Sequence, residues 1–460
     1  MKQLTLKKIA DAVNGQLKTK FNSIKIDGVA TDSRRDDLSG SLFTCLTGER
    51  FDGHDFVRDA IAKGAACILS EKRLDTLHPV ILVPSAREAL KNLAAYYRSL
   101  FDIHVVAVTG SVGKTTTKDM IAQVLSAKYK TLKTEGNFNN DIGLPLCMFR
   151  LDDSYQAAVF ELGMNRPGEI RSLSKIVRPT VSVITNIGVA HIENFSTKEG
   201  ILRAKTEIFE FLAEDGHIIL NGDDELLKTI RTDKRQIHYF GRHHNNYYSA
   251  FNIRNNGLIG VVCTFKYGGN EFKANIPLPG GHIVDNALAA VAAGDILGLG
   301  AEGIKNGLES VRPLKMRMDV LNAPGGVTLI NDVYNASPNS VMAGLDVLSG
   351  VGSRKVCILG DMLELGEASL KYHNDIGAYA AQKRIDSIVC VGALSRETYN
   401  GAKKHAAKTT ECAYYADSDA LLPNLDKLTE EGDTVLVKAS RAMRFERVVD
   451  AMMRRGGNDG

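Results

Sequence analysis

The chain has 460 residues, enough for two to four domains with substantial cores. Apolar residues make up 44% and charged residues 24%, as in ordinary soluble globular proteins. The net charge of +3 gives no general basic surface for nucleic acid, and no stretch is long and apolar enough to span a bilayer. The chain begins without the apolar core of a signal peptide, and its seven cysteines form no C-x-x-C pair. We therefore expect a cytoplasmic protein with reduced thiols, without nucleic-acid partners or stable membrane association.

Residues 1–98 are predicted to form a small first α/β unit. It begins with an amphipathic helix over residues 6–13, closed by Gly15, and short strand-like runs follow. Two polar segments, 31–34 and 46–54, come directly after such runs, so we interpret both as loops at strand ends. Loops in this position commonly hold ligands, but solvent-exposed turns have the same composition. The residues alone favour neither interpretation.

The most informative stretch is residues 104–125, HVVAVTGSVGKTTTKDMIAQVL. An apolar, β-branched run predicts a buried strand, and a helical pattern follows the Gly- and Thr-rich segment. A glycine-rich turn between a strand and a helix binds phosphate through backbone N–H groups and the helix dipole. Lys114 would reach the outer phosphates, and Thr115 would bind Mg²⁺. The motif is a shortened loop, G-x-x-G-K-T, and its context favours a triphosphate site over a turn that binds nothing.

Apolar runs that stop at a polar residue recur after this loop, with helical segments between them. Alternating strands and helices predict a parallel, doubly wound sheet, whose ligands bind at the carboxyl ends of the strands. The polar residues after these runs are therefore expected on the same side as the phosphate loop: Glu161, Asn186, His191 and Asp223.

Lys205 stands out for a different reason. In the helical segment 201–212 it lies within the apolar stripe made by Ile201, Ile208 and Leu212. A lysine in such a stripe usually extends its amine outward to solvent. The alternative is an ionisable group that points inward for a functional reason, and the pattern leaves both open.

The second unit, 99–313, also contains a change of pattern. From about 236 to 279, short alternating strands with Asn- and Gly-rich turns predict an antiparallel insertion at the edge of the sheet. Residues 314–460 return to the α/β alternation and predict a second, Rossmann-like sheet. No G-x-G-x-x-G follows its strands, which argues against a dinucleotide. The polar residues at its strand ends are Asp332, Tyr334, Asn335, Asp361, Glu364, Lys438, Ser440 and Arg441.

Taken together, these motifs resemble those of the ATP-dependent Mur ligases of peptidoglycan synthesis. The motifs shared across that family are TGSVGKTTTK, VFELG with Glu161, TNIGVAH with His191, AKTEIF with Lys205, and NGDD. LFTCLTGERFDGHDF, GNFNNDIGLPL, ELGMNRPGEI, NDVYNASPNS, LGDMLELG and VKASRAMRFE are typical of the branch that adds D-alanyl-D-alanine. The resemblance covers all three units. It implies a monomeric enzyme that joins D-alanyl-D-alanine to the terminal carboxylate of UDP-N-acetylmuramoyl-tripeptide through an acyl phosphate.

The resemblance also implies residue roles. ATP would be bound from both sides of a hinge near 312–316, by Thr109, Gly110, Ser111, Val112, Gly113, Lys114, Thr115, Thr116, Asn286, Arg317 and Asp332. Two Mg²⁺ ions would be held by Thr115, Glu161, His191 and an N-carbamylated Lys205, and catalysis would depend on these last three residues and Lys114. The substrates would contact Ser33, Arg34, Thr47 and Gly48 at the UDP end, Asn139 and Asn140 along the peptide, and Asn335, Asp361, Glu364, Lys438, Ser440 and Arg441 in the third unit.

Two positions depart from the family pattern. Thr47 stands where relatives usually carry lysine, which removes one cationic contact with the nucleotide. Ile283 stands where they usually carry asparagine, which removes a polar contact near the adenine. The sequence does not determine whether the tripeptide ends in diaminopimelate or lysine.

Three functions stay open at this point. Besides the D-alanyl-D-alanine-adding ligase, the architecture fits another amide ligase, such as a folylpolyglutamate synthase or an earlier Mur ligase. The motifs of the first and third units argue against this second possibility. The third is a P-loop switch or motor. The chain lacks the guanine-reading Asn-Lys-x-Asp sequence, and Glu161 stands where a Walker-B aspartate would, so this class is disfavoured.

Overall fold

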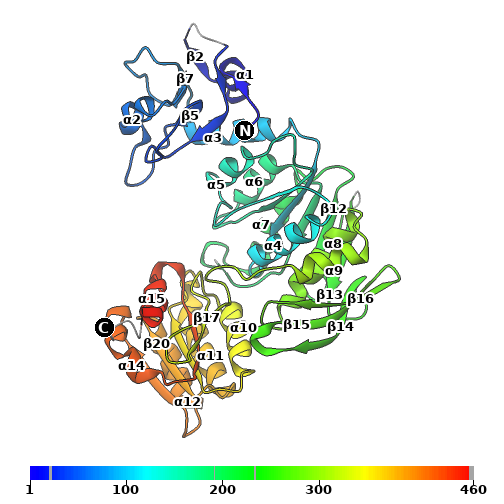
Figure 1. The fold of residues 1–460 in the computed structure, drawn as a ribbon, viewed down its shortest axis with the longest axis vertical. Helices are drawn as coiled ribbons and strands as arrows, with labels where there is room; N and C mark the ends of the chain where they lie inside the picture. The colour runs from blue at the N-terminus through cyan, green and yellow to red at the C-terminus, as the bar shows by residue number, and fades with distance from the viewer. Residues whose placement is uncertain (20–22, 191, 233–234, 455–460) are drawn as a thin grey trace.

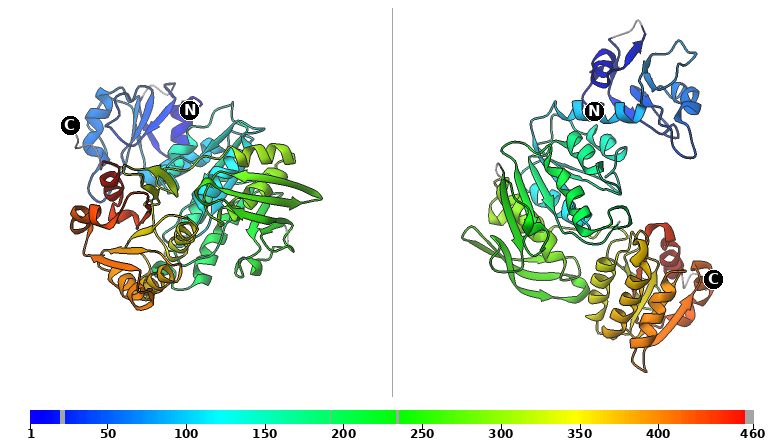
Figure 2. Two further views of the ribbon diagram at one scale, coloured as in Figure 1. Left: turned by 60° about the horizontal axis from the view of Figure 1, so that its bottom comes forward. Right: turned by 180° about the vertical axis from the view of Figure 1, so that it is seen from behind.

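The strand and helix patterns fold into three α/β units, each containing one large sheet (Figure 1). The computed structural model describes residues 1–19, 23–190, 192–232 and 235–454. The second unit lies between the first and the third, which form the two ends of a curved arrangement (Figure 2). Each large sheet lies inside one of the ranges 1–98, 99–313 and 314–460, whose exact boundaries stay a prediction.

The first unit combines a five-stranded sheet, in the order β2-β7-β6-β5-β4, with a ribbon of β1 and β3. Helix α1 (Leu6–Val13) forms because its apolar residues share one face. The side chain of Thr5 caps its start, and Asn14 ends it in the left-handed conformation with φ 52°. The other elements are β1 (Leu4–Thr5), β2 (Gln16–Lys18), β3 (Lys25–Ile26), β4 (Gly28–Ala30), β5 (Ser41–Thr44), α2 (Val57–Ala62), β6 (Cys67–Ser70) and β7 (Val80–Leu82).

Helix α3 (Ala86–Arg98) connects the first unit to the second. Its apolar side chains, including Leu90 and Leu93, belong to one core cluster that contains residues of both units. The hydroxyl of Tyr97 accepts a hydrogen bond of 2.5 Å from the backbone N of Lys2 and donates one of 2.6 Å to the carbonyl of Leu151. The first two units therefore share a core across this helix.

The second unit contains a nine-stranded sheet in the order β16-β15-β14-β13-β12-β11-β8-β10-β9. The strands from β9 to β13 pair in parallel, with apolar clusters on both faces, which confirms the doubly wound sheet. Its elements are β8 (His104–Thr109), α4 (Lys114–Leu125), β9 (Thr131–Lys133), α5 (Gly143–Met148), β10 (Ala157–Glu161), α6 (Glu169–Val177), β11 (Val181–Ile184), α7 (Lys198–Thr206), β12 (His217–Asn221), β13 (Gln236–Gly241), β14 (Tyr248–Asn255), β15 (Val261–Tyr267), β16 (Asn270–Ile276), α8 (Ile283–Ile296) and α9 (Ala301–Glu309).

The antiparallel insertion starts later than predicted. Strand β13 pairs in parallel with β12, and the start of β14 pairs in parallel with β13. Among the described strands of this sheet, only the pairs β14–β15 and β15–β16 are antiparallel. The expected start near 236 was wrong because the connection at 222–235 is long enough for a crossover, which places β13 alongside β12 in the same direction.

The third unit contains a six-stranded sheet in the order β17-β18-β22-β19-β20-β21, antiparallel only at the β17 edge. Two apolar clusters cover its two faces, as in the predicted Rossmann-like fold. Its elements are β17 (Asp319–Asn322), β18 (Thr328–Asn331), α10 (Pro338–Ser349), β19 (Lys355–Gly360), α11 (Ser369–Gln382), β20 (Ser387–Val391), α12 (Ser395–His405), β21 (Glu411–Tyr415), α13 (Ser418–Leu421), α14 (Leu425–Leu428), β22 (Thr434–Lys438) and α15 (Glu446–Arg454).

The cysteines are free thiols, and all but Cys412 are buried. Burial raises the pKa of Cys45 and of Cys67 to about 12, so both thiols stay protonated at neutral pH. Within the described ranges, no helix is long and apolar enough to cross a membrane.

Candidate active site

The glycine-rich loop lies between β8 and α4, as the sequence predicted. Gly113 is the N-cap residue of α4 and has φ 84°, and a Cβ there would lie 2.7 Å from Oδ1 of Asn286. The position therefore accepts only glycine. Asn286 also accepts a hydrogen bond of 3.1 Å from the hydroxyl of Thr117, so its side chain fastens α8 to α4.

The loop is held from the neighbouring strand end, after β11. The Asn186 side chain accepts a hydrogen bond of 2.9 Å from the N–H of Val112 and donates one of 2.8 Å to its carbonyl. The hydroxyl of Thr185 donates to the same carbonyl at 2.7 Å. Gly188 N donates to the hydroxyl of Ser111 at 2.8 Å. These bonds fix the loop before any phosphate arrives.

Glu161 is the last residue of β10, and its side chain is buried beside the loop. Its carboxylate accepts a hydrogen bond of 2.8 Å from Nδ2 of Asn139. Both residues line the same cavity as Thr115. Asn140 also lines it, and its side chain accepts a hydrogen bond of 2.8 Å from the N–H of Gly143, the first residue of α5.

The donors around Glu161 fit a magnesium ion. Mg²⁺ is usually bound by one or two carboxylates, substrate phosphates and water, rather than by a complete protein cage. The described residues contain no group of three or more His, Cys, Asp and Glu side chains placed to hold a metal. Thr115 and Glu161 nevertheless supply hard oxygen donors beside the phosphate loop. The predicted ligand His191 lies outside the described residues.

Lys205 is buried, with 3% of its surface exposed, so it does not extend to solvent. No described residue accepts a hydrogen bond from its amine. Burial, followed by the positive charge of Lys114, lowers the pKa of Lys205 well below its usual value. The inward orientation that the sequence left open is therefore the one adopted.

The third unit presents a buried ion pair to the same region. Asp332 follows β18, and Lys438 ends β22. Lys438 Nζ donates to Asp332 Oδ2 at 2.6 Å and to the carbonyl of Asn335 at 2.9 Å. The guanidinium of Arg317 lies 3.8 Å from the centre of the Tyr334 ring, a cation–π contact that orients it.

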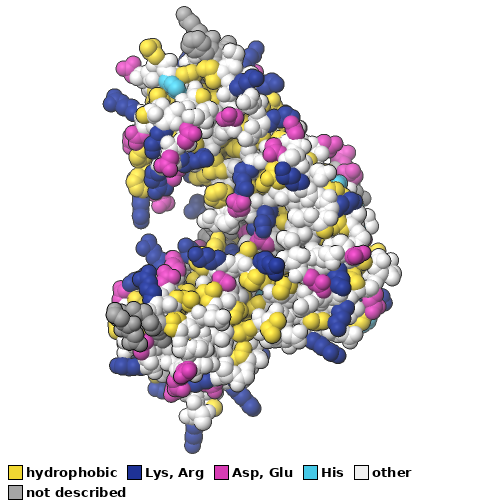
Figure 3. All heavy atoms as spheres, viewed as in Figure 1, with side chains coloured by type: hydrophobic (Ala, Val, Ile, Leu, Met, Phe, Trp, Pro, Cys, Tyr) yellow, Lys and Arg dark blue, Asp and Glu magenta, His cyan; other side chains and the backbone are white. Residues whose placement is uncertain are grey.

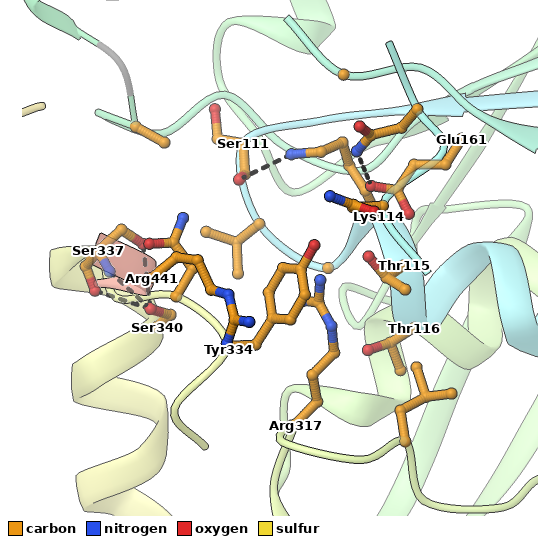
Figure 4. A pocket seen from close by; sticks show the side chains of 18 of the residues that line it. Ser111, Lys114, Thr115, Thr116, Glu161, Arg317, Tyr334, Ser337, Ser340 and Arg441 are labelled. Atoms are coloured by element: carbon orange, nitrogen blue, oxygen red, sulfur yellow. Dashed lines mark hydrogen bonds between the residues drawn. The ribbon is translucent and has the colours of Figure 1, made fainter. Parts of the chain in front are cut away.

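A cavity of about 1030 Å³ lies between the second and third units and brings these groups together. Figure 4 shows Arg317, Tyr334 and Arg441 facing the loop residues Lys114 and Thr115. Burial lowers the pKa of Lys114, and the charge of Glu161 opposes this effect. The predicted residues that line the cavity are Ser111, Val112, Gly113, Lys114, Thr115, Thr116, Asn139, Asn140, Glu161, Asn286, Arg317, Asp332, Asn335, Lys438 and Arg441.

Three predicted substrate residues of the third unit do not line the cavity. Asp361 is buried and accepts hydrogen bonds of 2.7 Å from both the backbone N and the hydroxyl of Ser395. The hydroxyl of Ser440 accepts one of 2.9 Å from Leu363 N. Glu364 is exposed and has φ 64°. Asp361 and Ser440 thus hold the strand ends together in this structure.

The predicted UDP contacts lie in the first unit, away from this cavity. The carbonyl of Ser33 accepts a hydrogen bond of 2.7 Å from Lys63. Arg34 is paired with Asp32 at 2.7 Å, and this hydrogen bonding lowers the pKa of Asp32 to about 2. Thr47 and Gly48 form a tight turn whose backbone bonds Phe51. Figure 3 shows a hollow in the surface between the first and third units.

Several cavity residues carried no clear sequence signal. Arg87 and Lys91 come from α3, and Arg166 precedes α6. Asp119 lies one turn along α4 from Thr115. Its position four residues after Thr115 places it on the same helix face, a spacing that could have identified it.

Family models of the three Mur ligase domains match the chain in order. The Mur ligase family catalytic domain matches residues 25–98, the Mur ligase middle domain 108–294, and the Mur ligase glutamate ligase domain 316–441. The chain belongs to the Mur ligase family. A Bacillus subtilis (strain 168) protein named UDP-N-acetylmuramoyl-tripeptide–D-alanyl-D-alanine ligase is 39% identical, over 97% of each chain. An Escherichia coli (strain K12) ligase of the same name is 36% identical, over 99% of this chain and 100% of that one.

Solved structures of Mur ligases share the three-unit fold. MurF from Acinetobacter baumannii has a TM-score of 0.92 and 34% identity, covering 99% of this chain and 100% of its own. MurF from Thermotoga maritima in complex with ADP has a TM-score of 0.82 and 29% identity, covering 93% of this chain and 97% of its own. The predicted three-unit α/β fold is confirmed.

Proposed function

We propose that this Mur ligase joins D-alanyl-D-alanine to the terminal carboxylate of UDP-N-acetylmuramoyl-tripeptide at the expense of ATP, in cytoplasmic peptidoglycan precursor synthesis. The observation that carries the proposal is one cavity that combines a P-loop with cations of the third unit. Similarity over the full length to ligases named for that reaction supports the choice of substrates. The enzyme acts as a monomer.

The first step is transfer of the γ-phosphoryl group of ATP to an oxygen of the tripeptide carboxylate, which gives ADP and an acyl phosphate. The loop's backbone N–H groups bind the phosphates, and Lys114 balances charge on the transferred group. Arg317, held over the Tyr334 ring, lies on the opposite wall of the cavity. Cations on two walls favour a polyanion placed between them.

A magnesium ion bound beside the loop would add to this charge balance. Thr115 and Glu161 would hold the ion, whose chemistry is to neutralise the phosphate oxygens as the phosphoryl group moves. Asn139 keeps the Glu161 carboxylate in one orientation through its hydrogen bond of 2.8 Å. We further assign N-carbamylation to Lys205, whose amine is buried without a described partner. The unprotonated amine would form a C–N bond to CO₂ and release a proton, and the resulting carbamate anion could attract a second cation.

In the second step the dipeptide's free amine attacks the acyl carbon. The C–N bond forms, the C–O bond to phosphate breaks, and the amine loses a proton. Holding amine and acyl phosphate in the same cavity can supply roughly 7–11 kcal/mol of the barrier reduction. Closing the third unit onto the second would exclude the water that hydrolyses an acyl phosphate. We place the UDP end near Ser33, Arg34 and the Thr47–Gly48 turn of the first unit.

The deciding experiment measures phosphate release from ATP with each co-substrate alone and with both together. A D-alanyl-D-alanine ligase releases phosphate at full rate only when UDP-N-acetylmuramoyl-tripeptide and D-alanyl-D-alanine are both present. Full activity with a different acceptor or amine would indicate another amide ligase. A rate of phosphate release that does not depend on either co-substrate would indicate a nucleotide switch or motor and would overturn the proposal.

A further inference from the structure

Glu161, at the end of β10, has no backbone pairing partner in the neighbouring strand β9. Strand β10 pairs with β9 only from Ala157 to Val159, because β9 ends at Lys133. On the other side the ladder continues, and Leu162 N donates to the carbonyl of Val108 at 2.8 Å. The N–H of Glu161, which points toward β9, therefore needs a partner from outside the ladder.

Thr134 supplies that partner through its side chain. Its hydroxyl accepts a hydrogen bond of 3.0 Å from Glu161 N, in a fully buried position. Its own N–H donates to the carbonyl of Val159 at 3.1 Å. Its carbonyl accepts a third bond, of 2.7 Å, from Nζ of Lys118. Thr134 is therefore held at three polar atoms, and one of these bonds reaches the backbone of Glu161.

Lys118 brings the P-loop helix into this arrangement. It lies on α4 one turn after Lys114 and is only 2% exposed. A buried ammonium is costly unless it is paired, and a methionine would fill the same space without that cost. Here the charge is balanced by Asp119, whose carboxylate lies 3.2 Å from Lys118 and 2.5 Å from Lys133.

We propose that Thr134 and Lys118 are positioning residues for Glu161. Lys118 fixes Thr134, and Thr134 fixes the backbone from which the Glu161 carboxylate projects beside the phosphate loop. Helix α4 thus carries both Lys114, which binds phosphate, and Lys118, which through Thr134 fixes the position of Glu161 in the cavity. The inference rests on the proposed function for the role of Glu161 as a metal ligand.

The test uses substitutions that change one hydrogen bond at a time. Thr134→Val keeps the shape and removes the hydroxyl, Thr134→Ser keeps the hydroxyl, and Lys118→Met removes the charge. Lys128→Met is the matched control, because Lys128 on the segment just after α4 also donates to a carbonyl, that of Gly298, at 2.8 Å. Each variant is measured for thermal unfolding, for Mn²⁺ binding in the presence of ADP, and for kcat and KM.

Loss of a partner that orients a metal ligand typically reduces metal affinity or activity about 10–100-fold. We expect this loss in Mn²⁺ affinity and in kcat for Thr134→Val and Lys118→Met, with an unchanged KM for D-alanyl-D-alanine. Thr134→Ser should recover most of it, and Lys128→Met should match the wild type. If Thr134→Val is too unstable to purify, Lys118→Met and Thr134→Ser decide the question, since both keep the hydroxyl.

The inference would be overturned if the variants unfold at a lower temperature but keep the Mn²⁺ affinity and kcat of the wild type. That result would show that these residues contribute to packing and do not position Glu161. A wild-type enzyme that binds Mn²⁺ with ADP but does not ligate the two substrates would instead overturn the proposed function. The metal-binding measurement keeps the two failures distinguishable.

Discussion

Lys114 Nζ donates a hydrogen bond of 2.9 Å to the carbonyl of Gly110, four residues earlier in the same loop. The cation therefore stabilises the loop from within. A phosphate offers an oxygen with a full negative charge, which makes a stronger hydrogen bond than a carbonyl. Binding of ATP should draw the ammonium away from Gly110 and toward the nucleotide.

Replacing Lys114 by alanine should abolish ligation and leave the fold intact. The variant loses the loop's own side-chain cation, and we expect kcat to fall by roughly 10²–10³-fold or more. The loop is still held by Asn186 and Thr185, so the unfolding temperature should change little. Phosphate release and thermal unfolding measure the two effects. Near-normal turnover would show that the P-loop assignment is wrong.

Lys205→Ala should be nearly inactive and should regain part of its activity when a short carboxylic acid such as formate is added. The acid would replace the two oxygens of the carbamate in the space that the side chain leaves. Arg203→Ala is the matched control, because Arg203 is exposed on the same helix. It should retain activity and show no response to formate. Carbon-13 NMR of the wild type in labelled bicarbonate should show a carbamate signal that Lys205→Ala lacks, and its absence from the wild type would contradict the assignment.

Nucleotide and UDP-tripeptide should close the third unit onto the second. ATP contacts are expected on both walls of the cavity, so the closed state gains contacts that the open state lacks. Small-angle scattering should therefore give a smaller radius of gyration with a nonhydrolysable ATP analogue and UDP-tripeptide, before the dipeptide binds. Arg317→Ala should weaken both compaction and turnover. Arg396→Ala removes another arginine–tyrosine contact, to Tyr414, between two residues that do not line the cavity, and should weaken neither. An unchanged radius in the wild type would argue against closure.

Stability should decrease in mild acid because of a histidine pair on the neighbouring strands β12 and β13. His217 Nδ1 lies 3.0 Å from His238 Nε2. Burial, followed by the charge of His217, lowers the pKa of His238 to about 4, against about 6.5 in the unfolded chain. Because the unfolded state gains its proton first, stability is complete above about pH 6.5 and is lost as pH falls toward 4. After allowance for partial exposure of His238, the loss should be about 1–2 kcal/mol.

Urea unfolding at neutral pH and near pH 5 would measure this loss. His238→Gln should reduce the difference between the two conditions. His244→Gln, at an exposed position, should leave it unchanged. Equal acid sensitivity in the His238 variant and the wild type would show that other groups cause the decrease.

The sequence predicted the parts of the site that local pattern determines. A strand, a glycine turn and a helix place Lys114 and Thr115 by chain geometry alone, and Glu161 is identified as the polar residue at which the apolar run 157–160 stops. The direction of β13 was not predictable in this way, because parallel and antiparallel neighbours can have the same alternating side chains.

Contacts between residues far apart in the sequence could not be predicted from the local pattern of apolar and polar residues. Asp361 and Lys438 both follow apolar runs, yet only Lys438 faces the cavity. The difference arises because the backbone N and the hydroxyl of Ser395 both donate hydrogen bonds to the Asp361 carboxylate. Nothing near Asp361 in the sequence indicates that partner. Thr134, Lys118 and Glu161 are likewise joined by bonds across 16 and 27 positions of the chain.

The shared core around α3 has a consequence for cutting the chain into pieces. Leu90, Leu93 and Tyr97 pack with residues of both flanking units. A fragment that begins after α3 would therefore expose apolar side chains of the second unit that α3 now covers. A fragment that ends before α3 would leave the first unit without one wall. The better place to divide the chain is the segment near 312–316, because the third unit that follows it has core clusters of its own. Gene fusions and exchanges between relatives should succeed at that joint and fail at residue 98.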